Sequence, residues 1–233
     1  TPETKVRAVS TGRYFTCIIS HDYEVWCAGE NGNGQLGDSS STDREIFVRT
    51  SFPAASKMVA IESGQYHSCA ISDTGKVYCW GNGGSGRLGD GNTTSRTSPV
   101  TVTKIAANRT AVSLSLWDDY SCALLDDGNV TCWGVSRSYG VGLSPSFPAQ
   151  RTAVAIATGY QHMCAVLDDG QVVCWGDGNQ MGNNRYSSAT PTNPNGLGTN
   201  TTPTGSRDMD GDGFDNVLDN CHDGSSSWTS NPG

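Results

Sequence analysis

The sequence predicts an all-β fold built from four copies of one short β-unit, and three observations lead to this prediction. Gly accounts for 29 of the 233 residues, whereas charged residues make up only 16% of the chain. No segment shows a sustained apolar period of 3.6 residues, so no long helix is predicted. Pairs of cysteines with one fixed spacing recur four times. Sequence rich in Gly, Ser, Thr and Asn is typical of turns and short strands.

The cysteine pairs define the repeat. In each pair the two cysteines lie ten residues apart, and the first cysteine recurs after 52, 53 and 42 residues. Periods of about 40–50 residues that contain several strands indicate propeller blades or a related β-array. The four pairs are Cys17 with Cys27, Cys69 with Cys79, Cys122 with Cys132, and Cys164 with Cys174.

Each pair brackets a predicted β-hairpin. Folding the segment between Cys69 and Cys79 about its centre leaves a three-residue loop, Asp73-Thr74-Gly75, in which Gly supplies a positive φ. Two other copies repeat this chemistry with Asp126-Asp127-Gly128 and Asp168-Asp169-Gly170. The first copy has Asp22-Tyr23-Glu24 instead, so we expect its turn to differ or to be strained.

The hairpin register places the two cysteines of a pair directly opposite each other, close enough to form a cross-strand disulfide. We therefore predict four such bonds. Reduced core cysteines are one alternative. Metal ligation is another, but His, Cys and Asp do not cluster at ligand spacings around the pairs.

A tryptophan and a glycine follow the second cysteine in three copies. A large ring followed by Gly suggests packing between blades with a close backbone approach. The alternative is a sugar-stacking platform, but recurrence at one slot favours an architectural role. The three rings are Trp80, Trp133 and Trp175.

The repeat resembles a known family. The string G-x-x-H-x-C-A-x-x-D-x-G-x-V-x-C-W-G, followed by G-x-L-G-D, is similar to the regulator of chromosome condensation propeller repeat, in a disulfide-bearing variant. The resemblance covers about residues 6–186, and we assign residues 1–186 to a domain of four propeller-type blades. It implies rings of seven blades, which would need roughly 350 residues at this repeat length. We therefore expect a fragment, an open array, or blades from several chains that complete one another.

The C-terminal region has a different composition. Residues 187–207 are rich in Thr, Asn, Pro and Gly and read as an extended linker, and residues 208–233 form a separate segment. In that segment acidic residues occupy loop positions 1, 3, 5 and 12, with Gly213 at position 6, which is the spacing of a calcium loop. A solvated acidic turn is the alternative. The predicted Ca²⁺ ligands are Asp208, Asp210, Asp212, the Phe214 carbonyl, Asp215 and Asp219.

The acidic string resembles thrombospondin type-3 repeats more than helical calcium loops. Such repeats are extracellular, bind calcium and join neighbouring units through cysteine pairs. The resemblance implies that Cys221, the ninth cysteine, pairs beyond Gly233 or with another chain, and that the chain is part of a longer precursor.

Charge and cysteine usage limit the setting. A net charge of −8 with only 15 basic residues disfavours nucleic acid and anionic membrane surfaces as partners. No apolar run reaches the length of a membrane span, and no signal peptide is visible at Thr1. Paired cysteines point to an extracellular or cell-surface location. Four glycosylation sequons fit that location: Asn92, Asn108, Asn129 and Asn200.

No residue pattern predicts catalysis. His67 and His162 share a repeat slot with Phe15 and Tyr120, which favours packing over chemistry. The glycine run 81–86 lacks the lysine of a phosphate-binding loop, and Gly37-Asp38-Ser39 is read as repeat punctuation rather than a nucleophile motif.

These observations predict a non-catalytic, secreted or cell-surface structural or adhesive protein. We expect it to associate with like subunits into a filament or array, because incomplete rings leave blade faces and edges unpaired. The alternative is a propeller that binds a specific protein or glycan partner through its loops. A glycan-degrading enzyme is less favoured, since no carboxylate pair stands apart from the repeat.

Overall fold

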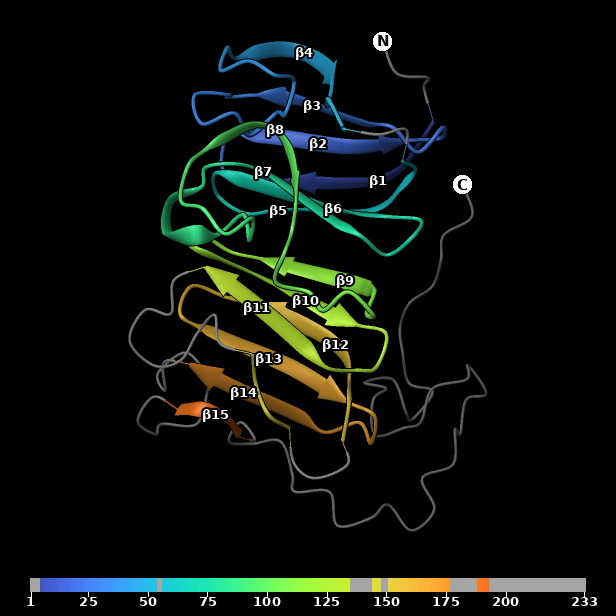
Figure 1. The fold of residues 1–233 in the computed structure, drawn as a ribbon, viewed down its shortest axis with the longest axis vertical. Coiled ribbons are helices and arrows are strands. Elements are labelled where there is room, and N and C mark those ends of the chain that lie inside the picture. The colour runs from blue at the N-terminus through green and yellow to red at the C-terminus, as the bar shows by residue number, and fades with distance from the viewer. Residues whose placement is uncertain (1–4, 54–55, 135–143, 148–150, 177–187, 193–233) are drawn as a thin grey trace, which may run out of the picture. The chain divides into compact units, whose positions relative to one another are not determined.

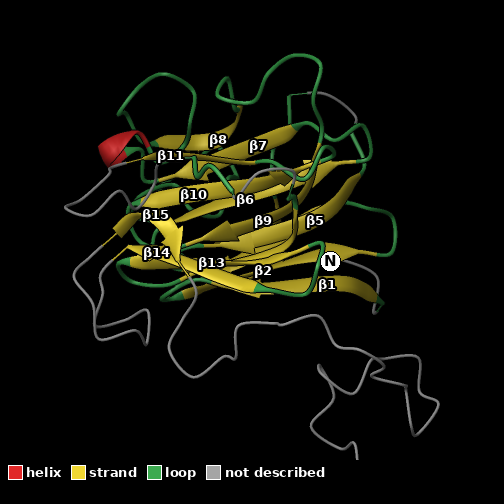
Figure 2. Ribbon diagram, turned by 90° about the horizontal axis from the view of Figure 1, so that it is seen from below, coloured by secondary structure: helices red, strands yellow, loops and turns green. Residues whose placement is uncertain are grey.

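The computed structural model describes residues 5–53, 56–134, 144–147, 151–176 and 188–192. Short antiparallel strands make up most of this part, and a three-residue 3-10 segment, η1 (Gly84–Gly86), is its one helical element (Figure 2). The strands form four sheets that follow one another in chain order (Figure 1). The prediction of four propeller-type blades is confirmed.

Each sheet is a simple meander, and we call the sheets blades 1 to 4. Blade 1 contains β1 (Val6–Thr11), β2 (Phe15–Ser20), β3 (Val25–Gly29) and β4 (Arg44–Arg49), and blade 2 contains β5 (Met58–Ser63), β6 (His67–Ser72), β7 (Val77–Gly81) and β8 (Arg96–Thr101). The described part of blade 3 comprises β9 (Ala111–Leu116), β10 (Tyr120–Leu125) and β11 (Val130–Gly134). Blade 4 contains β12 (Ala153–Thr158), β13 (His162–Leu167), β14 (Val172–Gly176) and β15 (Ser188–Thr192).

Strand β15 lies inside the range that composition predicts as a linker. It pairs with β14 through Cys174 and Thr192, so the fourth blade extends beyond residue 186. Pro191 is compatible with this position because β15 is an edge strand, where a missing N–H breaks no ladder bond.

The predicted hairpin turn is present in all four blades. In blade 2 the Gly75 N–H donates to the Ser72 carbonyl at 2.9 Å, and Gly75 has a φ of +75°. Blade 1 forms the same turn without glycine, because Tyr23 adopts a φ of +64° and donates to the Ser20 carbonyl at 3.0 Å. The expectation of a strained first turn is therefore met by its backbone conformation.

The positive φ at this turn predicts that Gly75→Ala and Tyr23→Ala change the stability of the protein by different amounts. We expect Gly75→Ala to destabilise the protein by about 1–3 kcal/mol, because a side chain is disfavoured at positive φ. A Cβ on Gly75 would also lie 2.3 Å from Thr110 Cβ. Tyr23→Ala is the matched control at the same turn position, and we expect it to change stability by less than about 1 kcal/mol. Urea unfolding measures both, and equal effects would contradict this account.

The four predicted disulfides are present in the structure. In every hairpin the two cysteines are direct register partners, and their Cα atoms lie 4.1 Å apart. The bonds join Cys17 to Cys27, Cys69 to Cys79, Cys122 to Cys132, and Cys164 to Cys174.

The eight bonded cysteines are buried or half-buried. Cys27 is 0% exposed, and its Sγ lies 3.5 Å from the Thr50 hydroxyl; Cys132 is 9% exposed, and its Sγ lies 3.8 Å from the Met163 sulfur of blade 4. Each bond closes a hairpin whose strands have only five or six residues, so the crosslink compensates for a thin core.

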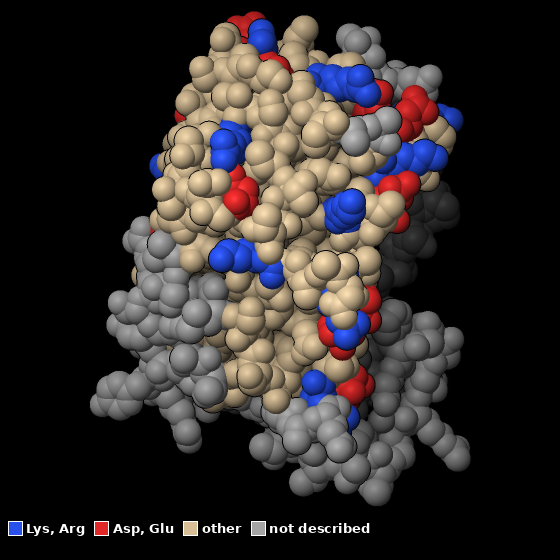
Figure 3. Space-filling view, viewed as in Figure 1, with Lys and Arg blue, Asp and Glu red and all other residues tan. Residues whose placement is uncertain are grey.

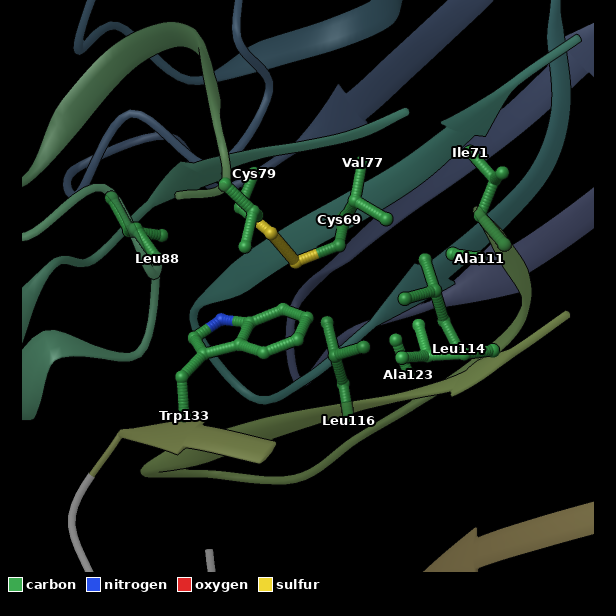
Figure 4. Close-up of a cluster of buried hydrophobic side chains, with 12 residues drawn as sticks. Cys69, Ile71, Val77, Cys79, Leu88, Ala111, Leu114, Leu116, Ala123 and Trp133 are labelled. Carbon is green, nitrogen blue, oxygen red and sulfur yellow. A yellow bond between two sulfur atoms is a disulfide. The ribbon is translucent and has the colours of Figure 1, made fainter. Parts of the chain in front are cut away.

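Among the described residues the hydrophobic core consists of three clusters, one between each pair of successive blades. In each cluster the earlier blade contributes its cystine, and we call the blade face that carries it the disulfide face. The later blade contributes the tryptophan after its second cysteine, and we call the blade face that carries this ring the tryptophan face. Between blades 2 and 3 the Cys69–Cys79 bond faces the Trp133 ring, with Leu114 and Leu116 beside it (Figure 4).

The tryptophans have the predicted architectural role. Trp80 and Trp175 are 0% exposed and Trp133 is 2% exposed, so none of them presents a ring face for sugar stacking. The Trp80 indole N–H donates to the Gln35 carbonyl at 2.9 Å, and the Trp133 N–H donates to the Arg87 carbonyl at 2.9 Å. Each of these bonds joins one blade to the loop of the preceding blade.

The Gly-Asp pairs of the repeat hold the loops between the third and fourth strands. Asp38 forms an ion pair with Arg44 at 2.8 Å, and Asp90 forms one with Arg96 at 2.7 Å. Burial raises the pKa of both carboxyl groups, but hydrogen bonds that include those from Arg44 and Arg96 outweigh it and keep each pKa below its usual value. Asp38 therefore has a structural role, in agreement with its interpretation as repeat punctuation.

Candidate functional site

Several predicted site residues lie outside the described residues. These are the calcium-loop residues between Asp208 and Asp219, together with Asn200 and Cys221. Within the described ranges no three His, Cys, Asp or Glu side chains gather as metal ligands. The same ranges contain no helix long and apolar enough to cross a membrane. The other three sequon asparagines, Asn92, Asn108 and Asn129, are all exposed.

His67 is a core residue. Its side chain is 0% exposed, and Nε2 lies 2.8 Å from the Ser121 hydroxyl of blade 3. The Ser121 hydroxyl donates a hydrogen bond to the Arg87 carbonyl at 3.0 Å. Its oxygen therefore accepts the hydrogen bond from the Nε2–H of His67. Burial, and secondarily the charge of Arg87, lowers the pKa of His67 to about 3. A neutral imidazole buried in this way is a structural group rather than a general base at neutral pH.

The loops between the first and second strands of the blades form the most chemically varied surface. Each loop is closed by the same backbone hydrogen bond, for example from Gly12 to Phe15 at 2.9 Å and from Gly64 to His67 at 2.9 Å. Two residues lie at each tip. We call this surface the tip face, and its residues are Arg13-Tyr14, Gln65-Tyr66, Asp118-Asp119 and Tyr160-Gln161.

A pocket of about 440 Å³ opens between the tips of the first three blades. The ends of three neighbouring first strands bring its walls together, since β5 contacts both β1 and β9. Gly64 permits the close approach, because a Cβ there would lie 2.4 Å from the Trp117 carbonyl. The lining residues are Thr11, Gly12, Arg13, Ser63, Gly64, Gln65, Leu116 and Trp117.

Arg13 supplies the positive charge of this pocket. Its backbone N–H donates to the Gln65 carbonyl at 3.2 Å, and its guanidinium donates to the Tyr66 hydroxyl. The guanidinium carbon lies 5.0 Å from the centroid of the Tyr14 ring, whose residue is 58% exposed. Among the ion pairs of the described residues, none involves Arg13.

The carboxylates at the third tip are already paired. Arg87 of blade 2 lies 2.6 Å from Asp119 and 3.5 Å from Asp118, and it also donates to the Asp118 carbonyl. On the face seen in Figure 3, basic and acidic side chains lie beside one another, with uncharged areas between them.

The tip face was not identified by sequence reasoning. One signal could have found it, because the two tip positions differ among repeats while the residues around them recur. Repeated residues build the scaffold, whereas variable positions inside a repeated frame are free for recognition.

The repeat matches known family models. Two models described as "Regulator of chromosome condensation (RCC1) repeat" match, one at residues 6–35, 58–87 and 153–186, and the other at residues 22–71 and 74–124. The chain belongs to this repeat family. The RCC1 match includes parts of all four blades, so the resemblance read from the cysteine repeat is confirmed at the level of the family and the fold.

Curated RCC1 relatives are much longer than this chain. The mitochondrial RCC1 domain-containing protein RUG3 of Arabidopsis thaliana is 28% identical over 61% of this chain and 32% of its own length. The RCC1-like G exchanging factor-like protein of Mus musculus is 31% identical over 58% of this chain and 30% of its own length. The chain thus aligns with about a third of each of these relatives.

Several solved structures share the fold. Human WBSCR16 has a TM-score of 0.73 at 24% identity, covering 81% of this chain and 51% of that chain. Yeast RCC1 (Prp20) bound to Kap60 has a TM-score of 0.68 at 22% identity, covering 82% and 49%. The ectodomain of the receptor kinase ACR4 from Arabidopsis thaliana has a TM-score of 0.52 at 23% identity, covering 74% and 53%.

Proposed function

We propose that this RCC1-repeat chain is a non-catalytic interaction scaffold of the cell surface or extracellular space. The observation that carries the location is the set of four buried cystines, because disulfides persist in oxidising compartments. The exposed sequons support it, and we propose that they carry glycans. Alkylation of the unreduced protein in denaturant followed by intact-mass measurement tests the location, since eight alkylated thiols in the repeats would contradict it.

We further propose that the scaffold associates with like subunits through the face of blade 1 that corresponds to the tryptophan face of the later blades, with Ala28 in place of the tryptophan. On that face Val6 is 53% exposed and Val9 is 64% exposed. The equivalents of Val9 in blades 2 and 3 are Ile61 and Leu114, each 5% exposed against the preceding blade. Ile46 is 71% exposed and corresponds to Ser98, whose hydroxyl lies 2.9 Å from Ser39 of blade 1.

An apolar face of this kind differs from a capping repeat. Terminal repeats that cap an array present a polar outer face, whereas this face exposes Val6, Val9 and Ile46. The disulfide face of blade 4 from a second copy has the complementary chemistry, because every described blade junction joins these two kinds of face. Repetition of this contact from chain to chain would build the proposed filament or array.

Sedimentation velocity tests self-association. We expect the purified chain to associate with rising concentration and Val9→Asp to shift it to monomer, because the new carboxylate would be buried at the junction. Val112→Asp is the matched control, since Val112 is 56% exposed on β9 away from the blade junctions. A wild-type chain that stays monomeric at all concentrations, with and without Ca²⁺, would contradict the proposal.

The alternative function is recognition of a partner protein or glycan through the loops. The pocket at the tip face favours it, and yeast RCC1 is itself a propeller solved with a protein partner. The two functions are separable, because Tyr14→Ser at the tip should impair partner binding while leaving sedimentation unchanged. The calcium segment 208–219 remains a proposed Ca²⁺ site, testable by calorimetric titration of the chain with Ca²⁺ and with Asp212→Asn.

A further inference from the structure

We propose that the pocket between the tips of blades 1, 2 and 3 binds an acidic side chain of an extended segment on a partner protein. This inference rests on the alternative function above, partner recognition through the loops, and is independent of self-association. It is argued from the hydrogen-bond donors, the charge and the apolar wall of the pocket.

One residue that lines the pocket carries a hydrogen-bond donor that lacks an acceptor in the described part of the chain. The Trp117 indole nitrogen is buried and has no hydrogen-bond partner there. An unpaired buried N–H is unfavourable, so a ligand that supplies an acceptor gains the interaction without breaking another one. Arg13 and Gln65 on the opposite walls carry further N–H donors.

The charge of the pocket selects an anion. Arg13 forms no ion pair with a described carboxylate, whereas the nearest carboxylates of the third tip are paired with Arg87. One arginine matches one carboxylate, and such charge-assisted bonds are stronger than neutral ones. A phosphate carries more charge than one guanidinium balances.

The shape of the pocket favours a peptide over a free anion. Leu116 lines the pocket and gives apolar surface for the methylene groups of a glutamate or aspartate. The exposed Tyr14 ring at the rim offers a surface for the flanking residues of an extended chain. The volume of about 440 Å³ accommodates one such side chain with part of its backbone.

The test uses the six tryptophan indole N–H signals of the ¹⁵N-labelled full chain, with Trp117→Phe to assign the signal of Trp117. The probes are the peptides acetyl-Gly-Leu-Glu-Leu-Gly-amide and acetyl-Gly-Leu-Gln-Leu-Gly-amide, and sodium acetate. We expect the Glu peptide to shift the Trp117 signal in a saturable manner. The Gln peptide and acetate should bind at least about tenfold more weakly.

Variants of two exposed arginines locate the effect. Arg13→Gln should weaken binding of the Glu peptide by at least about tenfold. Unchanged positions of the other indole signals would show that the fold of this variant is intact. Arg7→Gln is the matched control, because Arg7 belongs to the same blade but lies on β1 over the Tyr23 ring, 4.1 Å from its centroid. No shift with the Glu peptide, equal binding of the Gln peptide or of acetate, or full binding by Arg13→Gln would each overturn the proposal.

Discussion

Arg87→Ala is expected to lower the free energy of unfolding by about 3–5 kcal/mol, because it removes the guanidinium that faces the buried Asp119 carboxylate. The Arg87 side chain is 8% exposed, and Asp119, 2.6 Å away, is 10% exposed. The guanidinium also donates to the Gly84 carbonyl at 2.8 Å and to the Asp118 carbonyl. The substitution therefore removes contacts that join blade 2 to blade 3 as well as the charge.

Arg49→Ala is the matched control for the loss of an ion pair. Arg49 lies 2.9 Å from Glu24, but the two side chains are 64% and 35% exposed. Water screens this pair, so we expect its loss to change stability by no more than about 1 kcal/mol. Guanidinium unfolding of both variants measures the difference, and similar losses would show that burial does not govern the Arg87 pair.

The sequence was sufficient to predict the blades because their determinants are local. A hairpin with cysteines ten residues apart sets its own register, and Cys69 and Cys79 are paired as that register requires. Gly75 specifies the turn, and the recurrence of Trp80 at one slot indicates a packing role. Each of these inferences depends on residues within about a dozen positions of one another.

The contacts between blades could not be predicted in the same way. Arg87 contacts Asp119, 32 residues later, and His67 contacts Ser121, 54 residues later. The position of His67 holds Phe15 in blade 1 and Tyr120 in blade 3. No spacing rule connects such pairs, because the relative position of two blades depends on many small packing contacts. The pocket was missed for the same reason, since Arg13, Gln65 and Trp117 come from three blades.

The same long-range contacts connect the fold to the proposed binding site. The Arg87 carbonyl accepts hydrogen bonds from Ser121 and Trp133, and its guanidinium holds Asp118 and Asp119 at the third tip. One residue therefore fixes the blade junction and neutralises the acidic tip beside the pocket. Preorganisation of this kind lowers the free-energy cost of ordering a recognition loop on binding.

Because His67 is buried in its neutral form, we expect the protein to lose stability in mild acid. Its pKa in the folded protein is lowered to about 3, first by burial and then by the charge of Arg87, while the unfolded chain has an ordinary value of 6.5. The unfolded state therefore binds a proton as the pH falls below 6.5, whereas the folded state does not until about pH 3. The stabilisation is complete above pH 6.5 and is lost progressively towards pH 3, by about 4–5 kcal/mol in all.

His67→Phe isolates this contribution, because Phe15 occupies the same slot in blade 1 and is 4% exposed there. At pH 7 we expect the variant to lose about 1 kcal/mol through the missing bond to Ser121. Between about pH 6.5 and 4.5, above the range in which Asp38 and Asp90 become protonated, wild type should lose about 2–3 kcal/mol more than the variant. Urea unfolding at several pH values measures both profiles, and parallel profiles would mean that His67 is protonated in the folded core.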